Sequence, residues 1–114
     1  MASEIGFITF DCKDGAVMID FWSELLGYEI RRGVYTTLRD PAGKKPTIYM
    51  QEVPEPRTTK NRVHVDLVTK DRVAETLRIE TLGGKVLQEV SENDTDWTVF
   101  QDPEGNEFCL FQDE

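Results

Sequence analysis

The sequence is poor in the residues that most often carry chemistry or cross-links, because its 114 residues include two cysteines and a single histidine. The N-terminus also lacks a basic segment followed by an apolar one. No secretory signal is therefore expected, and the cytoplasm is the expected compartment. In that reducing compartment, Cys12 and Cys109 are expected to remain free thiols and not to form a disulfide.

Positive charge and long apolar runs are also scarce. The chain has 13 Lys and Arg against 22 Asp and Glu, which gives a formal net charge of −9. This balance argues against nucleic acid and anionic membranes as partners, because both favour Lys and Arg. No apolar run approaches the roughly 20 residues that span a bilayer. The acidic residues are spread along the chain, which is typical of an ordinary solvated surface.

Apolar residues are nevertheless sufficient for a core, since they make up 39% of the chain and include six Phe, three Tyr and two Trp. Apolar spacing of three and four predicts amphipathic helices at 16–26 and 71–82, with Val73 and Leu77 facing inward in the second. Asp14 can cap the first helix, and Gly27 and Gly83 can end the two helices. Alternating patterns predict strands at 5–12, 28–32, 35–39, 47–53, 61–68, 85–90, 97–101 and 107–111, with a polar loop at 91–96.

The same order of elements occurs twice along the chain. Each half has a strand, a helix ending in Leu-Gly, two strands, an Asp-Pro-x-Gly turn (Asp40–Gly43 or Asp102–Gly105) and a last strand. Such a matching series favours a duplicated βαβββ unit over two unrelated stretches that share turn chemistry. The expected fold is α+β, with two βαβββ modules forming a cup-shaped mixed β-sheet and helices on the outside. The single domain 1–114 would contain module one at 1–53, a linker at 54–60 and module two at 61–114.

The only histidine lies in the stretch 61–67, where apolar and polar residues alternate. Val63, Val65 and Leu67 would face a core, which leaves His64 and Asp66 on the opposite face of the strand. In a cleft between the modules, His64 can contact a ligand or act as a general base. Asp66 would lie roughly 6–7 Å away along the strand, so direct pairing is not assured. The alternative is a histidine that only hydrogen-bonds a neighbour.

A ligand pocket is predicted on the sheet faces turned away from the helices. Phe7, Tyr49 and Trp97 can line an apolar wall that stacks a planar ligand, and packing between the modules is the alternative role for them. Cys109 can serve as a nucleophile, although a small buried residue is its simpler role. The predicted pocket residues are Phe7, Thr9, Tyr49, Gln51, His64, Asp66, Trp97, Glu107 and Cys109.

Three segments together resemble the vicinal oxygen chelate superfamily of glyoxalases, bleomycin-resistance proteins and extradiol dioxygenases. They are Phe21-Trp22-Ser23-Glu24-Leu25-Leu26-Gly27-Tyr28, Asn61-Arg62-Val63-His64-Val65-Asp66-Leu67 and Asp102-Pro103-Glu104-Gly105-Asn106-Glu107-Phe108. The chain is most similar to the small glyoxalase-like domain proteins of this group. The resemblance covers nearly the whole chain and implies the paired βαβββ fold. It names no reaction, because one fold supports many chemistries.

The resemblance also implies where a divalent metal would lie, since enzymes of this superfamily usually hold one on the concave strands as a Lewis acid. The family's ligand positions fall on Phe7, on Gln51 or Tyr49, on His64 and on Cys109. Phe7 cannot ligate, and a stable site needs at least three protein ligands. We therefore expect no metal and no other cofactor. If a divalent ion does bind, the expected ligands are His64 and Glu107.

Together these features predict a glyoxalase-like protein that binds a small organic molecule in the cleft without a metal. One alternative is a metal-dependent lyase or isomerase of the glyoxalase type that uses His64 and Glu107. Another is an antibiotic-sequestering resistance protein of the bleomycin-binding type. Those relatives work as dimers whose acidic grooves take up a cationic drug, and the net charge of −9 is compatible with that. Exposed sheet edges favour a homodimer, with a monomer as the alternative.

Overall fold

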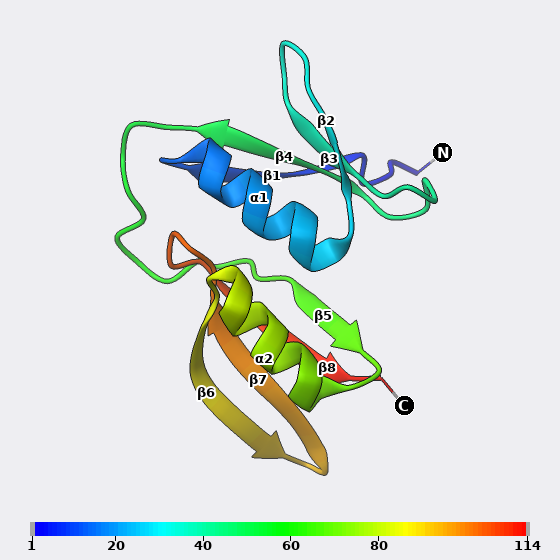
Figure 1. The fold of residues 1–114 in the computed structure, drawn as a ribbon, viewed down its shortest axis with the longest axis vertical. Helices are drawn as coiled ribbons and strands as arrows, with labels where there is room; N and C mark the ends of the chain where they lie inside the picture. Colours follow the sequence, from blue (N-terminus) through cyan, green and yellow to red (C-terminus); the bar gives the residue numbers. More distant parts are fainter. Residues whose placement is uncertain (1, 114) are drawn as a thin grey trace. The chain divides into compact units, whose positions relative to one another are not determined.

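The computed structural model describes residues 2–113, and the chain divides into two compact units between Pro56 and Arg57. Each unit contains one helix and one four-stranded sheet, in the order strand, helix and three strands (Figure 1). This order confirms the predicted α+β fold of two βαβββ modules. Among residues 2–113, no helix combines the length and the apolar character that crossing a membrane requires.

The first unit consists of β1 (Phe7–Cys12), α1 (Gly15–Leu26), β2 (Glu29–Arg31), β3 (Thr37–Arg39) and β4 (Thr47–Glu52). The strand order is β1-β4-β3-β2, with β1 and β4 parallel and the other pairs antiparallel. A parallel pair needs a crossover connection, and α1 is part of that connection. The helix lies over one face of the sheet (Figure 1), so the other face is available for a binding site.

The second unit repeats this topology with β5 (Asp66–Thr69), α2 (Arg72–Leu82), β6 (Lys85–Glu92), β7 (Thr95–Gln101) and β8 (Glu107–Gln112). Its strand order is β5-β8-β7-β6, and β5 and β8 are the parallel pair. The first and last strands of each module are therefore neighbours. That pairing brings residues near position 66 beside residues near position 109, which are far apart in sequence.

Both helices begin and end as the sequence predicts. The carboxylate of Asp14 accepts a hydrogen bond from the Val17 amide, and that of Asp71 accepts one from the Ala74 amide. Each bond satisfies a backbone donor that the first helical turn leaves free. Gly27 and Gly83 follow the helices with φ of 67° and 113°, the left-handed geometry that glycine adopts without strain. The duplicated signals therefore have the same structural role in both units.

The core of the first unit lies between α1 and its sheet. The helix buries Met18, Phe21, Trp22 and Leu25, and the Trp22 ring meets Phe10 edge-on with centroids 5.1 Å apart. Such aromatic pairs add specific geometry to the burial of apolar surface. The inward face of the sheet is thus used for packing, as the helical spacing predicts, and only the opposite face can bind a ligand.

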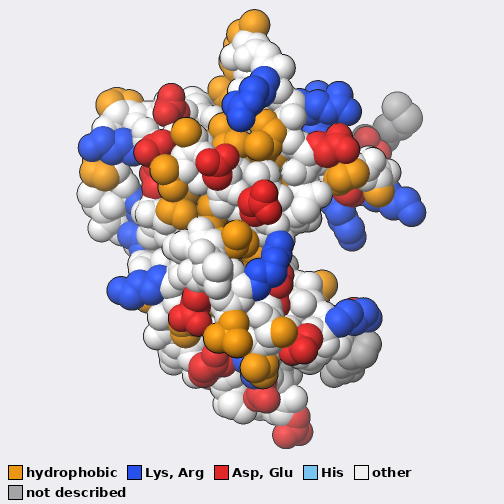
Figure 2. All heavy atoms as spheres, in the orientation of Figure 1, with side chains coloured by type: hydrophobic (Ala, Val, Ile, Leu, Met, Phe, Trp, Pro, Cys, Tyr) orange, Lys and Arg blue, Asp and Glu red, His pale blue; other side chains and the backbone are white. Residues whose placement is uncertain are grey.

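The inner face of α2 differs from the sequence prediction. Val73 and Leu77 are 72% and 62% exposed, whereas Ile79 is fully buried. The prediction that Val73 and Leu77 face inward is wrong. The helix instead turns Arg72 toward the sheet, where its guanidinium donates to Glu89 at 2.6 Å and to the buried Thr98 hydroxyl at 2.7 Å. Hydrophobic side chains consequently lie on the surface over α2 (Figure 2).

Two strand predictions also require correction. The predicted strand 61–68 begins only at Asp66, because the side chain of Asn61 replaces ladder bonds to the backbone of Glu107. Val63 therefore lies outside the strand and is 85% exposed, so the prediction that it faces a core is wrong. The predicted loop 91–96 is instead a tight hairpin, in which β6 runs to Glu92 and β7 starts at Thr95. Asn93 and Asp94 turn the chain with φ of 50° and 63°. Asn and Asp tolerate this left-handed geometry better than other non-glycine residues.

Candidate functional site

The first sheet carries a pocket of about 600 Å³ on the face opposite α1. Its floor is one row across the four strands, because the register places Thr9 opposite Tyr49, Tyr49 opposite Thr37, and Thr37 opposite Arg31. Directly opposed residues project from the same face of a sheet. The row therefore brings side chains from four separate segments into one concave surface. Its volume is in the range that small-molecule sites occupy.

Exposed apolar side chains form the walls of this pocket. Phe7 is 67% exposed, and Val34 and Tyr35 of the β2–β3 loop are 95% and 69% exposed. The Tyr35 ring meets Tyr49 edge-on with centroids 5.7 Å apart, which ties the loop to the floor. Hydrophobic and basic side chains lie together where this loop projects at the top of the view (Figure 2). Clustered exposed apolar surface in a concavity is typical of a binding site.

The pocket is locally basic although the chain is acidic. Arg31, Arg32 and Arg39 line it, and no Asp or Glu does. Arg31 has a carboxylate neighbour in Glu29, at 3.9 Å, and both side chains are more than half exposed. The pocket therefore has the opposite sign from the net charge of −9. An acidic groove for a cationic drug, as in one sequence-based alternative, is not what this pocket offers.

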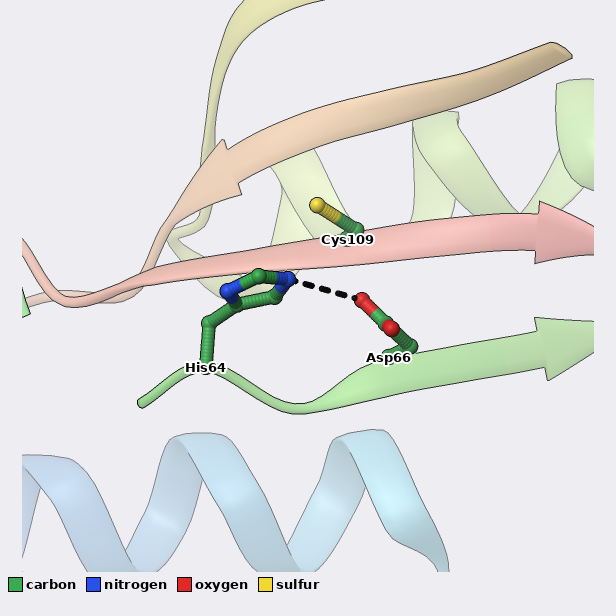
Figure 3. Close-up of side chains that lie close together, drawn as sticks. All are labelled: His64, Asp66 and Cys109. Atoms are coloured by element: carbon green, nitrogen blue, oxygen red, sulfur yellow. Dashed lines mark ion pairs between the residues drawn. The ribbon is translucent and has the colours of Figure 1, made fainter. Parts of the chain in front are cut away.

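The second unit brings His64, Asp66 and Cys109 together. One ligand-capable atom from each lies within 4.8 Å of the others. Figure 3 shows His64 on the segment that leads into β5, Asp66 at the start of β5, and Cys109 on the adjacent β8. The parallel register places Asp66 directly beside Cys109, which explains how residues 43 positions apart meet. The cluster combines nitrogen, oxygen and sulfur donors.

His64 and Asp66 form an ion pair, with 3.2 Å between Nε2 and Oδ1 (Figure 3). The side chains are 46% and 53% exposed, so solvent screens the pair and its contribution to stability is small. The spacing of roughly 6–7 Å expected along a strand is that of the backbone, and the two side chains bridge it. The carboxylate therefore lies within contact distance of the imidazole and can orient it.

The surroundings of the Cys109 thiol favour its protonated form. Burial raises the pKa of this thiol, and the carboxylates of Asp66 and Glu107 raise that pKa further. A thiolate is the nucleophilic form of cysteine, so these surroundings disfavour nucleophilic catalysis by Cys109. A bound cation would favour the thiolate instead.

Asn61 positions this cluster, and the sequence analysis did not single it out. Its side-chain amide donates to the backbone oxygens of Val63 at 2.9 Å and Glu107 at 3.0 Å, and its Oδ1 accepts from the Glu107 amide at 2.7 Å. These bonds hold the segment before β5 against β8. An asparagine five residues before a strand carries no such information by itself, because its two bonds to Glu107 span 46 positions.

We expect an Asn61→Ala variant to lose about 2 kcal/mol of unfolding free energy, because partly buried backbone groups of Glu107 lose their partners. We also expect the His64 side-chain resonances to move toward those of an unfolded chain. Chemical denaturation and NMR of the imidazole would measure both effects. Asn93→Gly, in the exposed β6–β7 turn, is the control for a general loss of asparagine, because glycine keeps the left-handed φ of 50° without strain. An unchanged His64 environment in Asn61→Ala would contradict the positioning role.

The remaining predicted site residues lie in different places. Phe7, Thr9 and Tyr49 line the pocket of the first unit, whereas Gln51 pairs with Asp11 beyond it. Trp97 stacks on Phe111 with centroids 5.4 Å apart. Glu107 pairs with Lys60 at 3.6 Å and is not a member of the His64 cluster. The sequence analysis missed the lining residues Arg31, Arg32, Val34, Tyr35, Thr37 and Arg39, for which the alternation within 28–32 and 35–39 was the available signal.

The donors at the His64 cluster fit a divalent transition metal. Imidazole, carboxylate and thiolate are all ligands that Zn²⁺ accepts, and three protein ligands with one open position are typical of a catalytic zinc site. Zinc–ligand bonds of about 2.0–2.3 Å place two donors up to roughly 4 Å apart. The observed spread of up to 4.8 Å is close to that requirement. The structure thus groups Asp66 and Cys109 with His64, where the sequence suggested Glu107.

Comparisons with known proteins agree with this fold. A family model described as "Glyoxalase-like domain" matches residues 7–111. No curated protein matches the sequence. The solved structure of the fosfomycin resistance protein FosX from Listeria monocytogenes has a TM-score of 0.79 and 19% identity, covering 100% of this chain and 96% of that one.

Two further solved structures are similar over nearly their whole length. A glyoxalase/bleomycin resistance protein/dioxygenase family enzyme from Burkholderia phytofirmans has a TM-score of 0.78 and 14% identity, with 96% of this chain and 98% of that chain covered. TnmS3, an antibiotic binding protein from a Streptomyces species, has a TM-score of 0.72 and 21% identity, with 99% and 98% covered. At these identities the likeness establishes the fold alone.

Proposed function

The chain belongs to the glyoxalase-like domain family, and from this premise we propose that it binds a small organic molecule in the pocket of its first unit. The observation that carries the proposal is the concave surface of about 600 Å³ with exposed aromatic walls. Leaving Phe7 and Tyr35 in water is unfavourable, and a ligand that covers them would remove that cost. The two tyrosine rings can stack a flat molecule.

The structural likeness to an antibiotic binding protein and to a fosfomycin resistance protein supports a screen that includes antibiotics. We therefore propose a broad library of small molecules of all charges, with antibiotics among them. Binding would be followed by NMR of the ¹⁵N-labelled full chain, which reports the residues that a ligand contacts. Amide shifts confined to the pocket residues would support the proposal. A library without any pocket ligand would count against it.

We expect a Phe7→Ser variant to bind a ligand found in this way at least about 10-fold more weakly, because it removes an apolar wall. Its unfolding free energy should change by less than about 0.5 kcal/mol, because Phe7 is 67% exposed. Val73→Ser is the matched control, since Val73 is 72% exposed but lies on α2 of the other unit. Isothermal titration calorimetry of the three proteins measures the difference. Equal losses in the two variants would contradict a role of the pocket.

A second candidate function is a metal-dependent lyase or isomerase, and the His64, Asp66 and Cys109 cluster is the observation that favours it. A divalent ion held there would act as a Lewis acid toward substrate oxygens. Of the chain's own residues, Asp66 orients the imidazole of His64, and Asn61 holds the segment that carries both. Metal binding by the purified chain is the first requirement of this function.

A further inference from the structure

We propose that the pocket of the first unit selects a flat aromatic ligand that carries a carboxylate. This inference rests on the proposed small-molecule binding and adds the chemical class of the ligand. It comes from how apolar and basic side chains are distributed along the pocket. The occupant favoured by that distribution is an aromatic carboxylate and not an aromatic cation.

The pocket is polarised across its strands. In the order β1-β4-β3-β2, the aromatic floor and wall residues Phe7 and Tyr49 lie on β1 and β4. Arg39 lies on β3 and Arg31 at the end of β2, and Arg32 follows directly. Strands are spaced about 4.8 Å apart, so roughly 10 Å separate β1 from β3. A two-ring molecule on Phe7 and Tyr49 would thus place a substituent near the guanidinium groups.

The arginines keep binding capacity for such a substituent. Among residues 2–113, Arg32 and Arg39 form no ion pair, and Arg31 has only the long, exposed contact to Glu29. A guanidinium presents paired N–H donors that match the two oxygens of a carboxylate. An ammonium group at the same place would be repelled.

Three probes with the same ring system test the charge preference: naphthalene-2-carboxylate, naphthalene-2-carboxamide and 2-naphthylmethylammonium. We expect the carboxylate to bind at least about 10-fold more tightly than the other two, because a charge-assisted contact is stronger than a neutral one. The preference should shrink as salt is raised from about 20 mM to 300 mM, because exposed charges are screened. NMR titration of the ¹⁵N-labelled full chain gives both affinity and location.

A pair of double variants separates a specific contact from general electrostatics. Arg32→Gln with Arg39→Gln should lower carboxylate affinity about 10-fold and leave carboxamide affinity unchanged. Lys44→Gln with Lys45→Gln removes the same charge from the same unit outside the pocket, and it should leave carboxylate affinity within about 2-fold. Equal losses in both double variants would overturn the inference.

The outcomes distinguish this inference from the proposed function. Equal binding of the three probes in the pocket, or tighter binding of the ammonium, would overturn the carboxylate preference and leave small-molecule binding intact. Carboxylate binding that shifts only residues of the second unit would also overturn the inference. If the naphthalene probes do not bind while the broad library yields a pocket ligand, the ligand class is wrong. If the broad library yields none either, the proposed function fails as well.

Discussion

A His64→Ala variant is expected to bind Zn²⁺ at least about 100-fold more weakly than the unaltered chain, if the His64 cluster is a metal site. The variant removes one of three donors whose ligand atoms lie within 4.8 Å of one another. Two protein ligands are fewer than a stable site requires. Stability without metal should remain unchanged, since the His64 side chain is 46% exposed. Competition with a chromophoric chelator measures the affinity.

Two further variants decide which residues are ligands. Cys109→Ser should weaken Zn²⁺ binding strongly, because a hydroxyl is a much poorer zinc ligand than a thiolate. Glu107→Gln should leave the affinity within about 3-fold, because Glu107 pairs with Lys60 outside the cluster. A Glu107→Gln effect as large as that of His64→Ala would instead support the ligand pair expected from the sequence. Absence of micromolar Zn²⁺ binding to the unaltered chain would contradict the second candidate function.

Replacement of Asp102 by alanine is expected to lower the unfolding free energy by about 3 kcal/mol. The Asp102 carboxylate is only 4% exposed and accepts hydrogen bonds from the Glu104 and Asn106 amides at 2.9 and 3.0 Å. It also accepts one from the Asn106 side chain at 3.0 Å. Its removal leaves these donors in a partly buried turn without partners. Urea denaturation monitored by tryptophan fluorescence measures the loss.

The repeat supplies a matched control at the equivalent turn. Asp40 accepts backbone hydrogen bonds from Ala42, Lys44 and Lys45 at 3.0–3.1 Å, but it is less buried than Asp102. The backbone hydrogen bond from Ala42, with those from Lys45 and Lys44, lowers the pKa of the Asp40 carboxyl. The ionised carboxylate therefore stabilises the fold above about pH 4, and this stabilisation is lost as the pH falls through the lowered pKa of Asp40. At pH 7, Asp40→Ala should cost clearly less than Asp102→Ala. Equal losses of unfolding free energy in the two variants would show that burial does not increase the cost of removing the turn aspartate.

Local chemistry explains which parts of the fold were predictable. Asp14 and Asp71 cap helices, and Gly27 and Gly83 end them, because each interaction involves residues within four positions. The duplicated order of elements then indicated two βαβββ modules and the family. The inward prediction for Val73 and Leu77 failed because α2 buries Ile79, which does not lie on the same side of the helix as Val73 and Leu77. The partners of Arg72 on the sheet decided how that helix is rotated.

The sequence predicted only part of the pocket in the first unit. Alternation placed Phe7, Thr9 and Tyr49 on one face, and the structure has them along one pocket. The sequence analysis missed Arg31, Arg32 and Arg39, because a short segment does not reveal which strands lie beside it in the sheet. Their position at the pocket follows from the register of β2, β3 and β4. The net charge of the whole chain was compatible with an acidic groove and gave no sign of a basic pocket.

By itself the sequence determined where each helix starts and stops, to within one residue, and that the chain repeats. These properties depend on neighbours in sequence, whose interactions are the same in any fold. Only the tertiary structure decided that His64 meets Asp66 and Cys109 and that three arginines surround an aromatic pocket. Those arrangements come from pairings between distant strands, and a shift of one residue in register would reverse the face that each side chain occupies.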